Sequence, residues 1–402
     1  MTVPTESEIA QRLADAQALR TKGDGASARA ICERLTVAAP DHPGGWMALG
    51  ILSVEARDWK AAIPALGNAI ARAPNNADFY FYLGVAHFND GNLAAAEIAF
   101  SKAVVLRPGH TEALHNLGGV RVADGRPKEA RVAFQAVIAR DPSFAASWVG
   151  LADVCRAEGD TAGVIAALTE ALKRDPHNPH ARHLLAAARG ESPAPDWRYV
   201  TEVFDGYAAR FEAHLTGPLQ YVGHQELVAL LQESIPGAAA FRRWLDLGCG
   251  TGLVATALLP GREIAERVGV DLAVGMVAAA KARGLYTEVV NAEANAFLGA
   301  ASDVFDLITA ADTFGYMGDL APVLAACARR LSGGGALAFM IKPKTGEGFA
   351  LDMQGYYVHA ESHVLSAAAC AGLAVSARRE APFRRHDGRA QTALYMVLVR
   401  EP

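Results

Sequence analysis

The 402-residue sequence has few cysteines and no long apolar run. The cysteines lie far apart and no two form a C-x-x-C pair, which argues against a disulfide framework and a structural zinc site. No apolar stretch approaches the roughly 20 residues of a membrane-spanning helix, and the first residues do not resemble a secretory signal. We therefore expect a cytoplasmic protein without membrane contact and without a bound metal.

Positive charge is also not in excess. The formal net charge is −5, so the sequence as a whole does not favour a nucleic-acid partner. Glu380 and Asp387 interrupt one cluster of arginines, which we interpret first as a solvated strand edge and only second as an anion-binding surface. The arginines of this cluster are Arg378, Arg379, Arg384, Arg385 and Arg389. Hydrophobic residues make up 51% of the chain, enough for the cores of two or three domains.

A repeat dominates the first half of the chain. Prolines recur every 34 residues, at Pro40, Pro74, Pro108, Pro142 and Pro176. Other positions keep the same period, as illustrated by Trp46, Leu49 and Gly50 in one segment and by Ala62 and Leu66 in the next. This pattern predicts pairs of antiparallel helices, in which the small residues allow close approach and the proline ends the second helix.

The repeat resembles the tetratricopeptide repeat. Four clear copies run from about residue 43 to 178, and a divergent first copy covers about residues 9 to 42. A terminal helix near residues 179 to 189 is expected to cap the stack. We therefore predict that residues 1–190 form an all-α solenoid of about five 34-residue repeats.

The first helices of the repeats present a rather apolar groove. Its predicted residues are Met47, Ile51, Val54, Phe81, Val85 and Phe88. An exposed apolar groove favours a protein or peptide partner, but the same residues could instead pack against the N-terminal segment or the second domain. Some repeat grooves bind a peptide carboxylate with a ladder of asparagines and lysines. Here only Asn116 occupies such a position, so that mode of binding is weakly supported.

Residues 191–196 form a predicted linker rich in proline, after which the 34-residue period ends. In residues 197–402, short apolar runs alternate with helical patterns, which predicts an α/β Rossmann-like domain with a mainly parallel seven-stranded sheet. The candidate strands are 243–247, 267–271, 287–290, 305–310, 336–341, 374–378 and 392–399. Ligands of such sheets bind at the carboxyl ends of the strands.

A glycine-rich loop follows the first candidate strand, with the sequence Gly248-Cys-Gly-Thr-Gly252. A dinucleotide fingerprint needs glycine or alanine where this chain has Leu253, and a phosphate-binding G-x-x-x-x-G-K-[ST] pattern is absent. Asp246 lies two residues before the first glycine. This acid suits a ligand with a cationic amino-acid moiety, either by compensating an ammonium group or by orienting the loop.

Two further acids follow later strands. Asp271 ends the second strand and can accept hydrogen bonds from both hydroxyls of a ribose. Glu293 follows the third strand and can accept from an exocyclic adenine amine. The alternative for each motif is structural, since glycines can simply make a tight turn and Asp271 can cap the next helix.

Together these motifs resemble those of class I S-adenosylmethionine-dependent methyltransferases. The matching pieces are 245–252, 268–271, 291–293, 305–312 and 331–335, where the last departs from the usual turn L-x-P-G-G. The combination with tetratricopeptide repeats resembles bacterial predicted methyltransferases. The resemblance implies S-adenosyl-L-methionine as cofactor, bound by Tyr207, Asp246, Gly248, Cys249, Gly250, Gly252, Asp271, Leu272, Met276, Ala292, Glu293 and Ala311, with Tyr207 on a lid helix.

Catalytic residues are expected after the fourth strand, beside the transferred methyl group. Asp312 could act as a base or orient the substrate, with Tyr316 next to it, while a structural role as a turn-capping acid is equally open for Asp312. His359 lies in a glycine- and aromatic-containing loop and could touch the substrate. Methyl transfer needs few protein groups because the cofactor supplies the driving force.

The sequence thus predicts an S-adenosylmethionine-dependent methyltransferase that acts on an oxygen or nitrogen atom, with the repeats recruiting a protein or peptide. One alternative is a small-molecule O-methyltransferase, acting on a carboxylate or hydroxyl, whose repeats serve assembly. A second alternative is a non-catalytic repeat scaffold that binds the cofactor.

Overall fold

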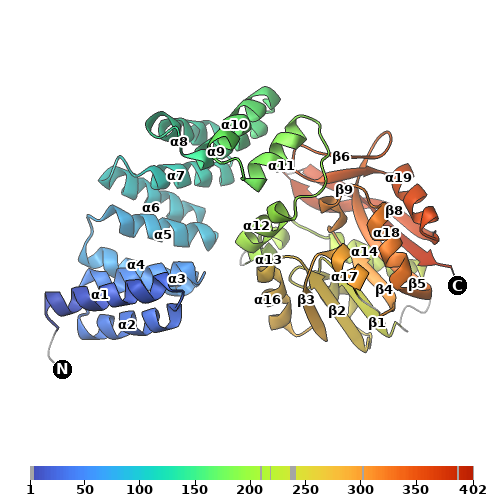
Figure 1. The fold of residues 1–402 in the computed structure, drawn as a ribbon, viewed down its shortest axis with the longest axis horizontal. Coiled ribbons are helices and arrows are strands. Elements are labelled where there is room, and N and C mark those ends of the chain that lie inside the picture. The colour runs from blue at the N-terminus through green and yellow to red at the C-terminus, as the bar shows by residue number, and fades with distance from the viewer. Residues whose placement is uncertain are drawn as a thin grey trace. The chain divides into compact units, whose positions relative to one another are not determined.

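The computed structural model describes residues 4–208, 211–217, 219–235, 241–300, 303–386 and 389–401. They divide into two compact units, Met1–His177 and Asn178–Pro402 (Figure 1). Helix α11 (Pro179–Ala188) continues the repeat pattern but belongs to the second unit. The domain and linker boundaries expected from the sequence, 1–190, 191–196 and 197–402, remain a prediction.

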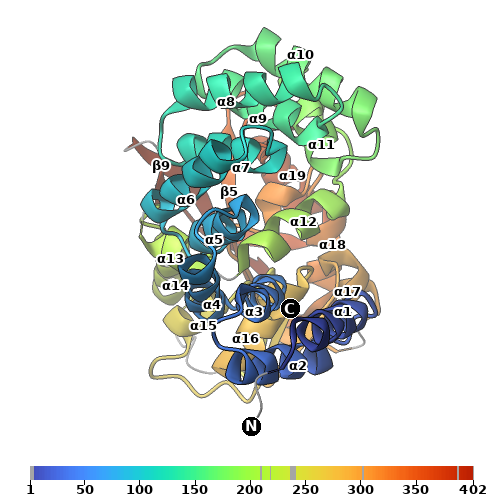
Figure 2. The ribbon, with the colours of Figure 1, turned by 90° about the vertical axis from the view of Figure 1, so that its left-hand side faces the viewer.

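The first unit is built from helical hairpins, as the 34-residue period predicts, and Figure 2 shows the hairpins following one another. Its helices are α1 (Glu6–Thr21), α2 (Gly25–Ala38), α3 (Pro43–Glu55), α4 (Trp59–Arg72), α5 (Ala77–Asn89), α6 (Leu93–Leu106), α7 (Thr111–Ala123), α8 (Pro127–Arg140), α9 (Ala145–Ala157) and α10 (Thr161–Arg174). Aspartate or asparagine side chains cap several of them, for example Asp58, which accepts from the Ala61 amide.

The hairpins pack by placing a large side chain on a glycine. A Cβ atom at Gly84 would lie 2.6 Å from the Phe100 ring, and one at Gly118 would lie 2.7 Å from the Phe134 ring. The Phe134 ring also lies against Gly150 of the next hairpin, where an added Cβ would be 2.5 Å away. These contacts explain why small residues recur with the period, because a side chain there would push the helices apart.

A second recurring contact joins several of the helix pairs to the proline before them. The Trp46 indole donates to the Pro40 carbonyl at 2.8 Å, and Arg72 donates to the same carbonyl while lying over the Trp46 ring. Arg174 and Trp148 repeat this arrangement around Pro142. The sequence analysis identified the prolines and tryptophans of this period but not the arginines.

The predicted groove residues are all half-buried. Met47 and Val54 pack with Leu66, while the Phe81 ring lies 4.8 Å from the His110 ring. Part of this apolar surface is therefore used within the stack of hairpins itself, and Ile51 is the groove residue absent from the described core clusters.

The second unit contains a nine-stranded sheet with the order β3-β2-β1-β4-β5-β7-β6, while β9 pairs with β5 and β8 with β9. Its strands are β1 (Arg243–Leu247), β2 (Glu266–Asp271), β3 (Glu288–Asn291), β4 (Phe305–Ala310), β5 (Leu331–Lys344), β6 (Phe349–Leu351), β7 (Tyr357–Ala360), β8 (Leu373–His386) and β9 (Arg389–Arg400). Strands β1 to β5 are parallel to their neighbours in this path, and β9 is antiparallel to β5.

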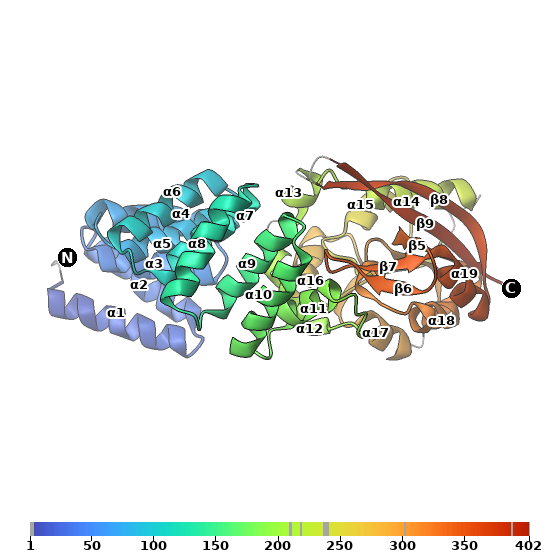
Figure 3. The same ribbon diagram turned by 90° about the horizontal axis from the view of Figure 1, so that it is seen from above.

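All seven predicted strands are present, but the sheet also includes β6, which was not predicted, and β7, which was expected to be part of a loop. They are three and four residues long and lie close to Gly348 and Gly355, so no periodic pattern could develop in them. Strands β8 and β9 are much longer than predicted and run side by side (Figure 3).

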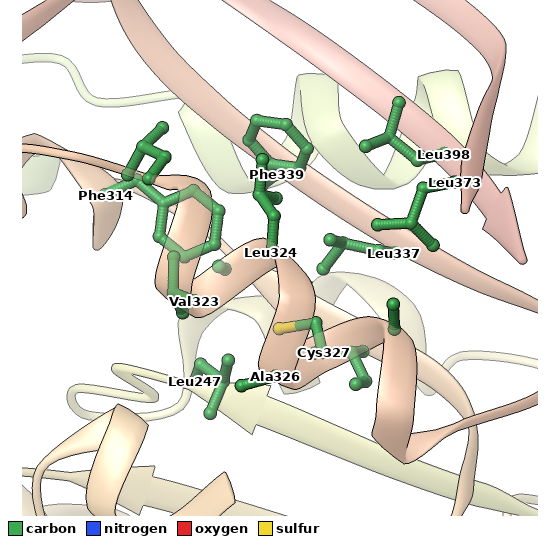
Figure 4. Close-up of a cluster of buried hydrophobic side chains, with 14 of the residues drawn as sticks. Leu247, Phe314, Val323, Leu324, Ala326, Cys327, Leu337, Phe339, Leu373 and Leu398 are labelled. Atoms are coloured by element: carbon green, nitrogen blue, oxygen red, sulfur yellow. The ribbon is translucent and has the colours of Figure 1, made fainter. Parts of the chain in front are cut away.

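Helices cover both faces of the sheet. Leu337, Phe339 and Ile341 of β5 point into one core, which helix α18 (Ala321–Arg330) covers with residues such as Leu324 and Cys327 (Figure 4). The alternate residues Ala336, Ala338 and Met340 point into the other core with helix α14 (Gly223–Ser234). This alternation is that of a strand buried on both faces, and it confirms the doubly wound α/β domain.

The remaining helices of this unit are α12 (Trp197–Tyr207), α13 (Phe211–Thr216), α15 (Leu253–Leu258), α16 (Val274–Arg283), α17 (Ala294–Ala300), the 3₁₀ helix η3 (Phe314–Tyr316) and α19 (Glu361–Cys370). Several of them begin directly after a parallel strand, so their N-termini lie at the carboxyl edge of the sheet. That edge is where the predicted site residues meet.

Among the described residues, the structure contains no helix that is both long and apolar enough to cross a membrane.

Candidate active site

The glycine loop between β1 and α15 has a backbone that only glycine adopts easily. Gly248, Gly250 and Gly252 have φ values of +64°, +52° and +93°. A Cβ atom at Gly248 would lie 2.3 Å from Oγ1 of Thr313, whose hydroxyl donates to the Leu247 carbonyl at 2.8 Å. At Gly250, by contrast, an added Cβ would meet only the Phe211 ring, at 3.7 Å, among the described residues. The loop therefore packs tightly on one side and leaves its backbone approachable at Gly250.

Asp246 lies beneath this loop and is completely buried. Its carboxylate accepts from the Tyr286 hydroxyl and from Thr309 Oγ1, both at 2.6 Å, and the Trp244 indole donates to Thr309 Oγ1 at 2.8 Å. Burial raises the pKa of Asp246 to about 7, although the bonds from Thr309 and Tyr286 lower it. These hydrogen bonds go to residues outside the glycine loop, so the role of Asp246 toward the loop or toward an ammonium group stays a prediction.

Asp271 joins the end of β2 to the glycine loop. Its Oδ2 accepts from the Gly250 amide at 2.8 Å, and its Oδ1 accepts from the Ala273 amide at 2.9 Å. Burial raises the pKa of Asp271, and the two amides oppose that shift. The acid thus holds the turn that leads into α16, whose N-cap is Ala273 without a side-chain capping bond, and it brings together the two motifs predicted to bind the cofactor.

The ends of β2 and β3 are held together by Asn291. Its side-chain amide donates to the Asp271 carbonyl at 3.0 Å and to the Leu272 carbonyl at 2.7 Å. Ala292 donates through its backbone to the Asp271 carbonyl at 3.0 Å. The sequence analysis quoted Asn291 within a motif but gave it no role.

Three other predicted cofactor residues differ in their surroundings. The Glu293 carboxylate accepts from the Ala296 amide at 2.8 Å and so caps α17. Met276 is buried, with 1% of its surface exposed. The Cys249 thiol is also buried, and burial raises its pKa, which excludes a reactive thiolate there.

Helix α12, which precedes β1 in the chain, lies against two elements of the site. Asp205 accepts from the Gly275 amide at 2.9 Å at the start of α16, and the Phe204 ring lies 5.2 Å from the Tyr316 ring. Tyr207 ends this helix, but its side chain is outside the part of the structure that is described. The helix is thus placed next to two predicted site elements.

Asp312 follows β4 directly and has a φ of +56°, which is uncommon for a residue other than glycine. Burial raises its pKa, while the positive charges of Arg384 and Lys342 lower it. Ala311, the preceding residue, packs at the margin of one sheet core. The structure therefore places the predicted base at the carboxyl edge, within the field of two cations that the sequence analysis did not assign to the site.

Tyr316 lies between two aromatic rings in η3. Besides Phe204, its neighbour is Tyr356, with ring centres 5.3 Å apart. Burial raises the pKa of Tyr316, and a hydrogen bond shared with Tyr356 raises it further. Tyr356 in turn accepts a hydrogen bond from Arg384 at 3.2 Å. Side chains from α12, from η3, from the residue before β7 and from β8 are thus in contact with one another near Asp312.

The surroundings of His359 differ from those of Asp312 and Tyr316. The side chain is fully buried on β7, and its Nε2 lies 3.0 Å and 2.8 Å from the carbonyl oxygens of Met317 and Gly318. Burial lowers the pKa of His359, so the ring is neutral and its Nε2–H donates to these carbonyls. This arrangement fixes the segment after η3 and does not bring the ring to Asp312.

Among the described residues, no group of three or more histidine, cysteine, aspartate or glutamate side chains is arranged to hold a metal ion. The site geometry therefore rests on glycine backbone, carboxylates, tyrosines and two cations.

Comparison with known proteins agrees with this geometry. Residues 245–339 match the family model of a methyltransferase domain, and residues 47–111 and 121–188 match models of the tetratricopeptide repeat. A curated relative, the ubiquinone biosynthesis O-methyltransferase of Sodalis glossinidius (strain morsitans), is 30% identical over 147 residues. That match covers 34% of this chain and 55% of the relative, so the chain spans about half of the relative's length.

Two solved structures are similar to single parts of the chain. The N-methyltransferase NodS from Bradyrhizobium japonicum WM9, in complex with S-adenosyl-L-homocysteine, is 18% identical with a TM-score of 0.36 and covers 44% of this chain and 86% of its own. The repeat protein YrrB, described as having an unusual peptide-binding site, is 20% identical with a TM-score of 0.38 and covers 43% and 89%.

The matched models identify tetratricopeptide repeats and a methyltransferase domain in separate parts of this chain. They agree with the predicted resemblance to methyltransferases that carry such repeats.

Proposed function

We propose that this protein is an S-adenosylmethionine-dependent methyltransferase that acts on an oxygen or nitrogen atom. The observation that carries the proposal is the hydrogen bond between the Gly250 amide and Asp271, which joins the glycine loop to the acid at the end of β2. This junction lies within the stretch that matches a methyltransferase domain.

The residues at the carboxyl edge fit the cofactor. Gly250 leaves its backbone open to a ligand, and each oxygen of Asp271 keeps a lone pair that can accept from a ribose hydroxyl. Ala292 and Glu293 would border the adenine, next to Leu272. When bound, the cofactor supplies an electrophilic methyl group on a sulfonium sulfur.

Asp312 is the proposed base. Burial raises its pKa, which makes the carboxylate a better proton acceptor than an exposed aspartate. Asp312 would take the proton that the acceptor atom loses as it receives the methyl group. Tyr316 lies beside this acid and would orient the acceptor.

The cofactor site is tested by the change Asp271→Ala. We expect binding of S-adenosylhomocysteine, measured by calorimetry, to weaken at least a hundredfold, because both the ribose acceptor and the bond to the Gly250 amide are lost. Glu263→Ala, at an exposed acid before β2, is the matched control and should bind normally. Unchanged affinity of the Asp271 variant would refute the assignment.

We also propose that the repeats recruit a protein or peptide, through the groove defined by Met47, Ile51, Val54, Phe81, Val85 and Phe88. Repeat stacks commonly bind partners on such a surface. A cytoplasmic location is part of this proposal.

Ile51→Glu tests recruitment. With labelled cofactor and cell extract, we expect label in protein for the unchanged enzyme and at least a fivefold decrease for the variant. Ile98→Glu on α6 is the control, because Ile98 is already 72% exposed. Label confined to small extractable molecules would contradict the recruitment proposal and support the alternative, a small-molecule methyltransferase with repeats used for assembly.

The small-molecule alternative is favoured by one observation, the burial of charged Arg384 beside the proposed base. A third possibility, a scaffold that only binds the cofactor, predicts binding without any transfer of label.

A further inference from the structure

Two cations lie at the same edge of the sheet as Asp312. Lys342 is near the end of β5 and Arg384 is near the end of β8. Both strands are antiparallel to β9, so their carboxyl ends point in the same direction. The sequence analysis grouped Arg384 with exposed arginines, and the structure corrects this, because only 8% of Arg384 is exposed.

The charge of Lys342 is compensated within the protein. Its Nζ lies 2.7 Å from Asp352 Oδ2 and 3.2 Å from Gln354 Oε1, and it also lies 4.9 Å from the centre of the Tyr356 ring. Lys342 therefore forms a partly buried ion pair and leaves little net charge for a ligand.

The charge of Arg384 is not compensated in this way. Within the described part of the chain, no carboxylate oxygen lies within 4.0 Å of its guanidinium. Its hydrogen bonds go to neutral groups: Nε donates to Gln391 Oε1 at 2.9 Å and a terminal nitrogen donates to the Tyr356 hydroxyl at 3.2 Å. The rings of Tyr356 and Phe383 flank it, each 4.8 Å away. Asp312 acts on this charge from beyond contact distance. A buried cation with no carboxylate in direct contact is costly, and such a group is commonly kept for a ligand.

Other arginines of the same strand behave differently. Arg378 pairs with Glu361 and Arg379 pairs with Glu233 at the surface. Arg384 differs from these two arginines in having no carboxylate in contact, and it lies close enough to Asp312 for its charge to act on that acid.

We propose that Arg384, together with Tyr356, binds a carboxylate group of the methyl acceptor and so directs a different oxygen or nitrogen atom of that molecule toward Asp312. This inference rests on the proposed methyltransferase function. A guanidinium matches the two oxygens of a carboxylate. Lys342 is already paired with Asp352, so Arg384 is left to offer a single guanidinium with no carboxylate in contact, which suits a monovalent carboxylate better than a doubly charged phosphate.

The carboxylate serves as a recognition group and not as the methylated atom. Asp312 takes a proton in the proposed reaction, and an ionised carboxylate has no proton to lose. The methylated atom is therefore a hydroxyl oxygen or an amine nitrogen elsewhere in the acceptor.

The test uses the full chain saturated with S-adenosylhomocysteine and three probes: benzoate, its neutral analogue benzamide, and phenylphosphonate. We expect benzoate to bind, measured by calorimetry, and benzamide and phenylphosphonate to bind at least tenfold more weakly. Arg384→Gln should weaken benzoate binding at least tenfold and Tyr356→Phe by a smaller factor, while Arg379→Gln serves as the matched control and leaves it unchanged.

The affinity for S-adenosylhomocysteine distinguishes a failure of the carboxylate site from a failure of the proposed methyltransferase function. If the Arg384 variant binds S-adenosylhomocysteine normally and loses benzoate, the carboxylate site is supported and the variant is folded. Absence of benzoate binding to the unchanged protein, equal binding of benzamide, tighter binding of phenylphosphonate, or unchanged benzoate affinity in Arg384→Gln would each overturn the inference. Failure of the unchanged protein to bind S-adenosylhomocysteine would instead refute the proposed function.

Discussion

The repeat unit and the methyltransferase unit are stabilised in opposite ways. In the repeats, one contact is used several times, as when Arg72 and Arg174 each donate to a proline carbonyl. In the second unit each contact occurs once, as in the set formed by Asp246, Tyr286 and Thr309. Loss of one contact should therefore have a small effect in the first unit and a large effect at the site.

The largest effect is expected for Gly248→Ala. The added Cβ would lie 2.3 Å from Thr313 Oγ1 at a residue whose φ is +64°, so both steric overlap and backbone strain oppose it. We expect a loss of about 4 kcal/mol in the free energy of unfolding, together with loss of cofactor-product binding.

Gly261→Ala is the matched control for Gly248→Ala. Gly261 also has a positive φ, +74°, but an added Cβ there would meet nothing within 4 Å. Urea unfolding should show a cost of about 1 kcal/mol for this variant. Equal costs for the two alanine variants would mean that the contact with Thr313 is unimportant.

A smaller effect is expected from the titration of Asp246. Its pKa is raised to about 7 by burial, so the folded protein holds this proton at pH values where the unfolded chain has lost it. The contribution of Asp246 to stability therefore falls as pH rises from 5 to 8, by roughly 2 to 3 kcal/mol.

The comparison variant for this titration is Asp246→Asn, whose amide does not ionise. Urea unfolding at several pH values should show that the unchanged protein loses stability relative to this variant as pH rises. A difference that is constant from pH 5 to 8 would show that Asp246 has an ordinary pKa in the folded protein.

The smallest effect is expected for Arg140→Leu in the repeats. Arg140 donates to the Pro108 carbonyl, and the equivalent position one repeat earlier is already a leucine, Leu106. We expect a cost of about 1 kcal/mol or less in urea unfolding, with Lys102→Leu as a control for exchanging an exposed cation. A cost above about 3 kcal/mol would show that the repeated contacts are not redundant.

The same comparison explains which features the sequence predicts. The hairpins follow from a regular pattern, because packing a large side chain on Gly84 or Gly118 recurs at a constant spacing. The glycine loop and Asp271 were identified because they form a motif whose members are close in sequence or follow successive strands.

Features that depend on distant, unrepeated partners were not predicted. Tyr286 lies 40 residues from Asp246, just before β3, and meets it although β2 separates β3 from β1 in the sheet. Arg384 looks like its exposed neighbours in the sequence, and only the folded strand shows that it is buried. His359 was predicted to touch the substrate, whereas its ring is enclosed and bonded to backbone carbonyls.

Phe134 limits how freely the repeats could be rearranged. Its ring lies against glycines of two successive hairpins, Gly118 on α7 and Gly150 on α9. The positions equivalent to Gly150 in the two preceding repeats are Asn116 and Tyr82, whose side chains would occupy the space of the ring. Exchanging α9 for α5 or α7 would therefore break this junction, so the order of the hairpins is fixed even though their individual folds are alike.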